Sequence, residues 1–252
     1  MHISGDKLDS TFLQKMDVGQ VANLFDLKLQ EEKELKEAVF FVSSPTALVP
    51  LAETIQRVMN ETGTILLAKG FKEGLGQWVL DFVRQTEGCT AAQLVESLAN
   101  TFPAFRDVAT YNGQDVYILK KAQLLAADLF RQLGEKEPAF LFADVTELTI
   151  FSDNVIPAVL REYGVLELSE ELAAHVDHKT VLKPGDREVE LRCVAIHACE
   201  EIVKLWKAKS GAEGGQPIQL NAMLLDYFLW EMGKQGHFRK VERHYTTDTA
   251  FY

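Results

Sequence analysis

The stretch that decides the fold is TFPAFRDVATYNGQDVYILKKAQLLAAD, residues 101–128. We interpret it as a helical segment, a tight turn at Asn112-Gly113 and a second helix that begins at Lys120. An Asn-Gly pair tolerates the positive φ angles that a tight turn requires. The free amides of the second helix's first turn, together with the Lys120 ammonium, would then face a bound anion. The stretch therefore predicts a helical corner with an anion-binding end.

This pattern is similar to a helix-hairpin-helix element. The alternative is an ordinary helical corner in which Lys120 and Lys121 are simply solvated, because such corners are common in helical proteins. The stretch alone does not separate the two interpretations.

Around this stretch, apolar residues recur at three- and four-residue spacing, which is typical of amphipathic helices. The expected helices cover residues 45–60, 77–84, 91–100, 120–133, 155–163, 169–178, 184–207 and 218–232, and the long seventh helix begins at either Pro184 or Asp186. Strand-like alternation is confined to residues 108–119 and 241–245. We therefore expect an all-α protein of about ten helices.

The division into domains follows from the same patterns. Residues 1–43 form an irregular N-terminal segment in which only residues 17–27 suggest a helix. Ser44-Pro45 resembles a helix start, with an N-cap followed by proline in the first turn. Residues 44–252 are therefore expected to form a single helical domain.

Composition excludes several classes of partner. The 252 residues carry 26 Lys+Arg and 37 Asp+Glu, a formal net charge of −11. Such a chain would repel the phosphates of a nucleic acid, so no direct nucleic-acid binding is expected. The apolar stretches are too short to cross a bilayer, and charges interrupt the first twenty residues, so we expect a cytoplasmic, monomeric protein without membrane contact.

The cysteines point to neither disulfides nor a metal site. Cys89, Cys193 and Cys199 are odd in number and contain no C-x-x-C pair. Cys193 and His197 share one helical face, as metal ligands could, but no second ligand pair accompanies them. We expect reduced thiols, no metal and no organic cofactor.

Five ordered segments together carry a family resemblance. They are residues 60–67 (NETGTILL), 105–128, 151–157 (FSDNVIP), 185–192 (GDREVELR) and 224–230 (LLDYFLW). With them the chain resembles the queuosine salvage protein family from about Phe12 to its C-terminus. The resemblance implies an N-glycoside hydrolase that releases the base queuine from queuosine 5′-phosphate, a small-molecule nucleotide. It also implies a helical fold like that of helix-hairpin-helix DNA glycosylases.

Under this resemblance the catalytic aspartate falls on Asp153, with Phe151 and Ser152 beside it at the base pocket. Cleavage of a C1′–N bond builds oxocarbenium character, which a carboxylate can stabilise, or relieve by activating water or by attacking. The residues do not choose among these three roles. Asp153 could equally cap a helix that begins near Val155, and the two roles are compatible.

The resemblance gives further residues a role. Lys120 matches a lysine that faces the active site, where it could meet a phosphate or the sugar. Asp226, Tyr227 and Glu231 match positions that contact queuine, whose secondary amine and diol suit acidic partners. Asp128 is expected to support the helix rather than to act in catalysis.

Simpler interpretations remain open for these residues. Phe151, Tyr227 and Trp230 could be core aromatics. Glu231 replaces an aspartate common in the family and could be a solvated carboxylate near a helix end.

Residues 1–43 match neither the histidine nor the aromatic stretch that family members carry near their N-termini. The alternative function is therefore a non-catalytic helical module that binds a modified nucleoside or a protein partner.

Overall fold

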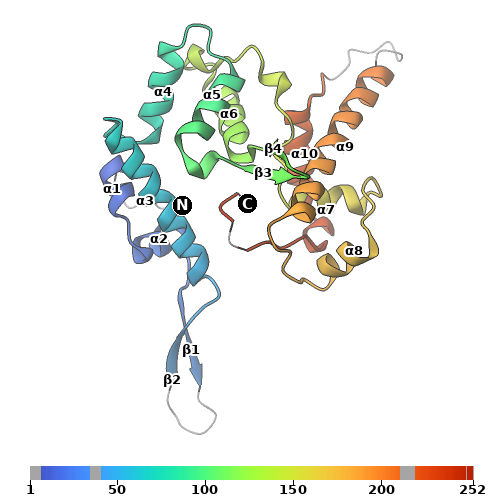
Figure 1. The fold of residues 1–252 in the computed structure, drawn as a ribbon, viewed down its shortest axis with the longest axis horizontal. Helices are drawn as coiled ribbons and strands as arrows, with labels where there is room; N and C mark the ends of the chain where they lie inside the picture. Colours follow the sequence, from blue (N-terminus) through green and yellow to red (C-terminus); the bar gives the residue numbers. More distant parts are fainter. Residues whose placement is uncertain (1–6, 35–40, 211–218, 248, 252) are drawn as a thin grey trace. The chain divides into compact units, whose positions relative to one another are not determined.

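The computed structural model describes residues 7–34, 41–210, 219–247 and 249–251 (Figure 1). The chain is mainly helical, as the sequence predicts, and the described residues form two short antiparallel hairpins besides the helices. The chain divides into two compact units, Met1–Phe82 and Val83–Tyr252.

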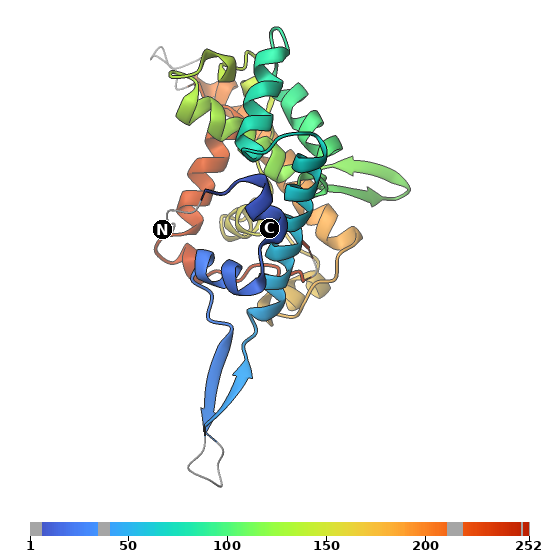
Figure 2. The same ribbon diagram turned by 90° about the vertical axis from the view of Figure 1, so that its left-hand side faces the viewer.

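Unit 1 is built on one long helix. Its elements are α1 (Ser10–Lys15), α2 (Val18–Phe25), β1 (Gln30–Glu34), β2 (Phe41–Pro45), α3 (Val49–Ala68) and the first part of α4 (Leu75–Gln85). α1 and α2 pack on α3, and the β1–β2 hairpin extends beyond these helices (Figure 2). The helix expected near residues 17–27 is confirmed as α2. Residues 10–15, however, are helical within the segment expected to be irregular, and the structure does not divide the chain at residue 43.

The long helix α3 differs from its prediction at both ends. Pro45 lies in β2, and the helix begins at Val49, with Pro50 in its first turn. It also continues through Thr62-Gly63, where we expected it to have ended. A Cβ on Gly63 would lie 2.3 Å from the backbone nitrogen of Gln14. Glycine is therefore required here because α1 approaches α3 backbone to backbone.

Unit 2 holds the remaining helices. They are α5 (Ala91–Thr101), α6 (Lys120–Leu133), α7 (Val155–Glu162), α8 (Glu170–Asp177), α9 (Asp186–Ser210) and α10 (Ala222–Gly233), with short 3₁₀ turns η1 (Pro103–Phe105), η2 (Pro138–Phe140), η3 (Val145–Glu147) and η4 (Phe238–Lys240). All six helices were expected, with bounds that differ by a few residues. The Gly-rich sequence of residues 210–217 (SGAEGGQP) predicts a loop after the long helix, and it lies almost wholly outside the described residues.

Residues 101–128, the stretch that decides the fold, are only partly as expected. α6 begins at Lys120 as predicted, but Asn112-Gly113 joins two strands, β3 (Val108–Tyr111) and β4 (Gln114–Tyr117). Tyr111 pairs with Gln114, and the two turn residues have φ angles of 50° and 76°. These angles fit the tight two-residue turn of a β-hairpin. The interpretation as helix, Asn-Gly turn and helix was therefore wrong, whereas the strand-like alternation in residues 108–119 is confirmed.

The core of unit 2 lies between α7, α9 and α10. Its largest members include Ile150, Ile156 and Leu160, which are fully buried. α10 approaches α7 so closely that a Cβ on Gly233 would lie 2.3 Å from Val155 Cγ1. This packing fixes the start of α7 against the side of α10. Predicted site residues lie just before α7 and on α10.

Among the described residues, no helix combines the length and the apolar character that crossing a bilayer requires.

Candidate functional site

Asp153 lies at the start of α7 and is 6% exposed. Its Oδ1 accepts hydrogen bonds from the backbone N–H groups of Val155, at 2.7 Å, and Ile156, at 3.4 Å. The carboxylate thus satisfies two of the amides that a helix start leaves without intrahelical partners. Its second oxygen, Oδ2, is directed to a side chain of another helix.

That side chain is Lys120, the first residue of α6. Its Nζ lies 3.3 Å from Asp153 Oδ2, and both side chains are largely buried. Lys120 follows Leu119, which has a φ of 51°, an uncommon conformation for a branched residue. The structure therefore brings together the two predicted catalytic residues, 33 positions apart in the chain.

A buried guanidinium lies behind this pair. Arg192 of α9 binds Asp107 through two hydrogen bonds, Nη1 to Oδ1 at 3.0 Å and Nη2 to Oδ2 at 2.5 Å. Its Nε donates to the carbonyl oxygen of Ser152 at 3.0 Å, and the Ser152 hydroxyl donates to the carbonyl oxygen of Arg192 at the same distance. Asp107 Oδ2 also accepts the backbone N–H of Lys120 at 3.2 Å.

Asp226 of α10 is a second buried carboxylate. Its Oδ1 accepts the backbone N–H of Phe151 at 2.8 Å. Burial, helped by the negative charge of Asp153 and opposed by the Phe151 hydrogen bond and by Lys120, raises the pKa of Asp226 to about 7. Asp226 therefore lies within electrostatic range of the Lys120–Asp153 pair.

Tyr227 links α10 to α6. Its hydroxyl donates to Asp128 Oδ1 at 2.6 Å, and its ring meets Phe151 edge to face at 5.9 Å between centroids. The Arg131 guanidinium carbon lies 3.8 Å from the centre of the same ring. Burial and the Asp128 hydrogen bond raise the pKa of Tyr227 to about 12. Asp128 thus supports α10 as well as its own helix.

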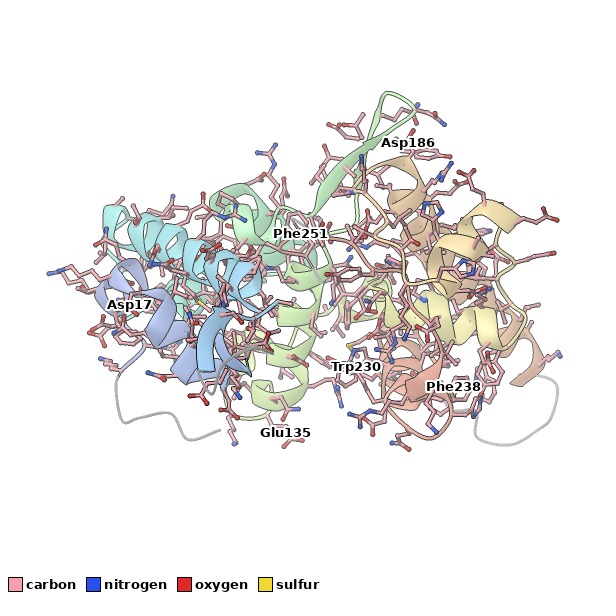
Figure 3. The ribbon with its side chains drawn as sticks, turned by 90° about the horizontal axis from the view of Figure 1, so that it is seen from below. Asp17, Glu135, Asp186, Trp230, Phe238 and Phe251 are labelled. Atoms are coloured by element: carbon pink, nitrogen blue, oxygen red, sulfur yellow. The ribbon has the colours of Figure 1, made fainter. Side chains whose placement is uncertain are left out.

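The structure does not group Glu231 with these buried residues. Glu231 is exposed on α10, and its Oε1 accepts a hydrogen bond from Gln235 Nε2 at 2.5 Å. Trp230 lies on the same helix (Figure 3). The ammonium of Lys234, the residue just after α10, lies 4.6 Å from the centre of the Trp230 ring. Burial lowers the pKa of Lys234. The positive charges of Arg243 and Lys120 lower it further, while the negative charge of Asp153 has the opposite effect. Lys234 is not among the residues predicted from the sequence. Its position four residues after Trp230 was the only local indication that the two side chains could meet.

His244 was also missed. It is buried, and burial together with the positive charge of Arg192 lowers its pKa to about 4, while Asp153 has the opposite effect. Asn154 Nδ2 donates to the His244 carbonyl oxygen at 3.3 Å. The alternation over residues 241–245 predicted a strand here, but the structure has only a single parallel bridge between Val181 and Tyr245.

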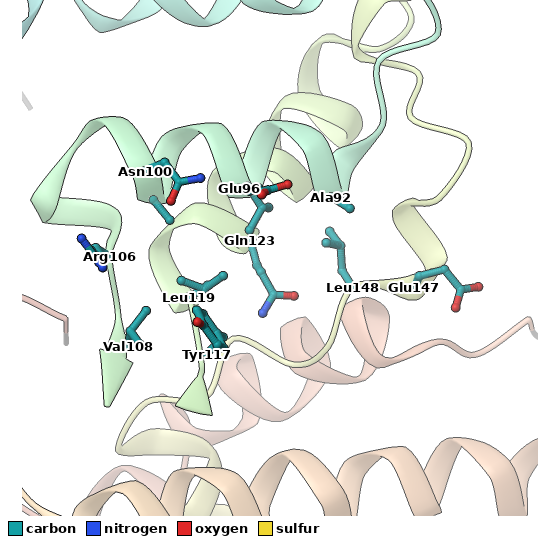
Figure 4. A pocket seen from close by; sticks show the side chains of 12 residues that line it. Ala92, Glu96, Asn100, Arg106, Val108, Tyr117, Leu119, Gln123, Glu147 and Leu148 are labelled. Carbon is teal, nitrogen blue, oxygen red and sulfur yellow. The ribbon is translucent and has the colours of Figure 1, made fainter. Parts of the chain in front are cut away.

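A cavity of about 550 Å³ lies elsewhere in unit 2, between α5, the β3–β4 hairpin, α6 and η3 (Figure 4). Its lining includes Leu119 and Gln123 but no predicted site residue. The Gln123 amide binds the Ile118 carbonyl oxygen at 2.9 Å and the Thr149 hydroxyl at 3.0 Å. Gln123 therefore connects the start of α6 to the chain that leads to Phe151.

The arrangement suits chemistry on a polar small molecule. A carboxylate with a cation beside it can stabilise positive charge, activate water or attack a carbon. Within the described part of the chain, no three histidine, cysteine, aspartate or glutamate side chains cluster as metal ligands would.

Fold and site together define a mainly helical protein with a buried lysine–aspartate pair at two helix starts. The chain belongs to the queuosine salvage protein family, whose model matches residues 8–252. This match confirms the resemblance and extends it by a few residues toward the N-terminus.

Curated relatives agree. The chain is 34% identical over 197 residues to the queuosine 5′-phosphate N-glycosylase/hydrolase of Mus musculus, covering 77% of this chain and 56% of the relative. It is 31% identical over 208 residues to the protein of that name from Sphaerobacter thermophilus, covering 81% and 59%. The chain thus spans somewhat more than half the length of these relatives.

Proposed function

We propose that this chain hydrolyses the N-glycosidic bond of queuosine 5′-phosphate and releases queuine for salvage into tRNA modification. The observation that carries the proposal is the buried Lys120–Asp153 pair, with a 3.3 Å separation between Nζ and Oδ2. The names of the relatives supply the reaction and the substrate. In the reaction, water adds at C1′ of the ribose, the C1′–N bond breaks, and the base leaves with a proton.

In this proposal Asp153 faces the anomeric carbon. Its Oδ1 is engaged by the α7 amides, so Oδ2 is the oxygen directed to the sugar. A negative charge there stabilises the oxocarbenium character of the transition state, activates water or forms a covalent intermediate. Lys120, beside that oxygen, binds the sugar or the 5′-phosphate.

The base would lie against α10. Phe151 and Tyr227 offer aromatic surface, and Asp226 offers a carboxylate to the secondary amine of queuine. Glu231 would reach the polar end of the base from its exposed position. Ser152 stays a predicted substrate-binding residue whose described hydrogen bonds join it to α9.

The finer fold assignment is also a proposal. We propose that α5 to α10 are related to the helical domain of helix-hairpin-helix DNA glycosylases, with the substrate a free nucleotide and not a duplex. The formal charge of −11 supports this choice of substrate. We further propose a cytoplasmic monomer that uses no metal or organic cofactor.

The test follows base release from three compounds: queuosine 5′-phosphate, queuosine and guanosine 5′-phosphate. The purified chain should release queuine, with the 5′-phosphate as the preferred substrate. Asp153→Asn should lose about 10²-fold or more in turnover, because the amide supplies no negative charge. Asp177→Asn, the same change at an exposed acid of unit 2, is the matched control and should keep the activity.

Binding of queuosine 5′-phosphate without release of base would contradict the hydrolase and favour the non-catalytic helical module. Near-native turnover in folded Asp153→Asn would remove this residue from catalysis.

A further inference from the structure

We propose that Arg192 is a positioning residue, which holds Lys120 and Asp153 in register by binding the two chain segments that carry them. The inference rests on the proposed function and deepens it at the same site. Arg192 itself lies behind the pair, so it acts through other residues.

One arm of this connection leads to Asp153. The Arg192 Nε donates to the carbonyl oxygen of Ser152, the residue just before Asp153, and the Ser152 hydroxyl returns a hydrogen bond to the Arg192 carbonyl oxygen. Ser152 is completely buried. These two bonds therefore fix the backbone from which the Asp153 side chain departs.

The other arm leads to Lys120 through Asp107. The carboxylate that binds Arg192 also accepts the backbone N–H of Lys120. The carbonyl oxygen of Asp107 accepts the N–H groups of Ile118, at 3.1 Å, and Leu119, at 3.0 Å. Asp107 thus sets the left-handed turn at Leu119 and the direction in which α6 begins.

Only arginine can make these contacts at once. Its planar guanidinium donates through Nε, Nη1 and Nη2 in a fixed fork. Here Nε meets Ser152, both Nη atoms meet Asp107, and Nη1 lies 3.4 Å from Glu188 Oε1. A lysine would keep the charge in the same place but could not hold both segments in this geometry.

Folding alone does not require this arrangement. A buried ion pair can often be replaced by packed apolar side chains without loss of stability, because desolvation offsets much of the attraction. What an apolar replacement cannot supply is a directional link between two backbone segments. The link matters here because the two segments end in the Lys120–Asp153 pair.

The kinetic test uses Arg192→Lys, with Val203→Ala as its matched control. Val203 is a core residue of the same helix and lies outside the site, so its change lowers stability without touching the pair. At temperatures where both variants are folded, Arg192→Lys should lose about 10²-fold in kcat, the cost of a misplaced catalytic group, with KM changed by less than about threefold. Val203→Ala should keep its kcat, and equal losses in both variants would overturn the inference.

A double variant adds a readout that a purely structural role would not move. If Arg192 acts through the pair, Lys120→Ala combined with Arg192→Lys should lose less than the product of the two single losses. Losses that multiply would mean that Arg192 acts independently of Lys120, and would overturn the inference.

A further experiment needs no substrate. Amide hydrogen exchange at Lys120 and Val155 reports the bonds to Asp107 and Asp153. Both amides should exchange about tenfold faster in Arg192→Lys than in Val203→Ala at equal global stability. Unchanged exchange at both would overturn the inference whatever the kinetics show. If the unaltered chain releases no queuine, the proposed function fails, and the hydrogen-exchange measurement alone then tests the positioning role of Arg192.

Discussion

Among the described residues of unit 2 are two arginine–aspartate pairs with the same chemistry in different surroundings. Arg161 of α7 binds Asp177 of α8 through Nη1, at 2.7 Å, and Nη2, at 3.0 Å. Arg192 binds Asp107 with the same two-bond geometry. The side chains of the first pair are 27% and 50% exposed, and those of the second are 3% and 5% exposed.

Because the geometry is the same and only the exposure differs, we expect burial to set what each ion pair contributes to stability. Water and salt weaken the attraction in the exposed pair, and holding two long side chains costs entropy. In the buried pair, desolvation offsets the attraction, but a partner left alone would be a buried, uncompensated charge. The buried pair can therefore be lost only at a large cost, whereas the exposed pair can be lost with little.

The largest expected effect is that of Arg192→Ala on stability. Removing the guanidinium leaves Asp107 buried without its cation, so the free energy of unfolding should fall by about 3–5 kcal/mol. Urea denaturation followed by circular dichroism measures the change. A loss below about 1 kcal/mol, as expected for an exposed pair, would show that burial does not distinguish the two pairs.

Asp226 sharpens the comparison because its described hydrogen bond comes from a backbone amide instead of a cation. Its pKa is raised from 3.8 to about 7, so the folded state holds a proton that the unfolded state has released. This stabilising effect is present below about pH 4 and is lost as the pH rises through about 7, by up to about 4 kcal/mol.

Asp226→Asn should not show this loss, so the stability of the variant relative to the unaltered chain should rise between about pH 4.5 and pH 7.5. Urea denaturation of both proteins at several pH values measures the difference. A difference that does not depend on pH would mean that Asp226 is ionised in the folded protein across this range.

Lys120→Ala tests the largely buried Lys120–Asp153 pair. If Lys120 contacts the sugar or the 5′-phosphate, its loss removes charge-assisted hydrogen bonds worth about 1.5–3 kcal/mol. Turnover should then fall about tenfold to a hundredfold, and the fall should be at least as large for queuosine 5′-phosphate as for queuosine. A larger loss on the nucleoside would argue against phosphate contact.

The sequence predicted the helices well because their signals are local. α6 was predicted to its exact bounds from apolar spacing. α7 ends at Glu162, two residues before Gly164, which adopts a φ of 69°. The continuation of α3 through Gly63 could not be predicted in this way. The reason for that glycine is the nearby backbone of α1, a contact between residues about fifty positions apart.

The site shows the same division. Asp153 and Lys120 came from a family register, and periodicity alone would not have paired them. Arg192 lies in one of the segments that carry the family resemblance, but no role was predicted for it. Nothing local connects it to Ser152, 40 residues earlier, or to Asp107, 85 residues earlier. His244 had only a misleading strand signal. Long-range polar contacts leave no periodic trace in a single sequence.

The smallest expected effect is that of Arg161→Ala on the exposed pair. Arg161 lowers the pKa of Asp177 through their hydrogen bonds, and Asp177 raises the pKa of Arg161 in return. Solvent and side-chain entropy nevertheless limit the net contribution, and the free energy of unfolding should fall by only about 0.2–1 kcal/mol. The loss should shrink further when the salt concentration is raised from about 0.1 M to 1 M, because the Debye length falls from about 10 Å to 3 Å.

Arg192→Ala, measured beside it, should keep its full effect in high salt, since its partner is shielded from ions. An Arg161→Ala loss as large and as insensitive to salt as that of Arg192→Ala would show that burial does not distinguish the two pairs.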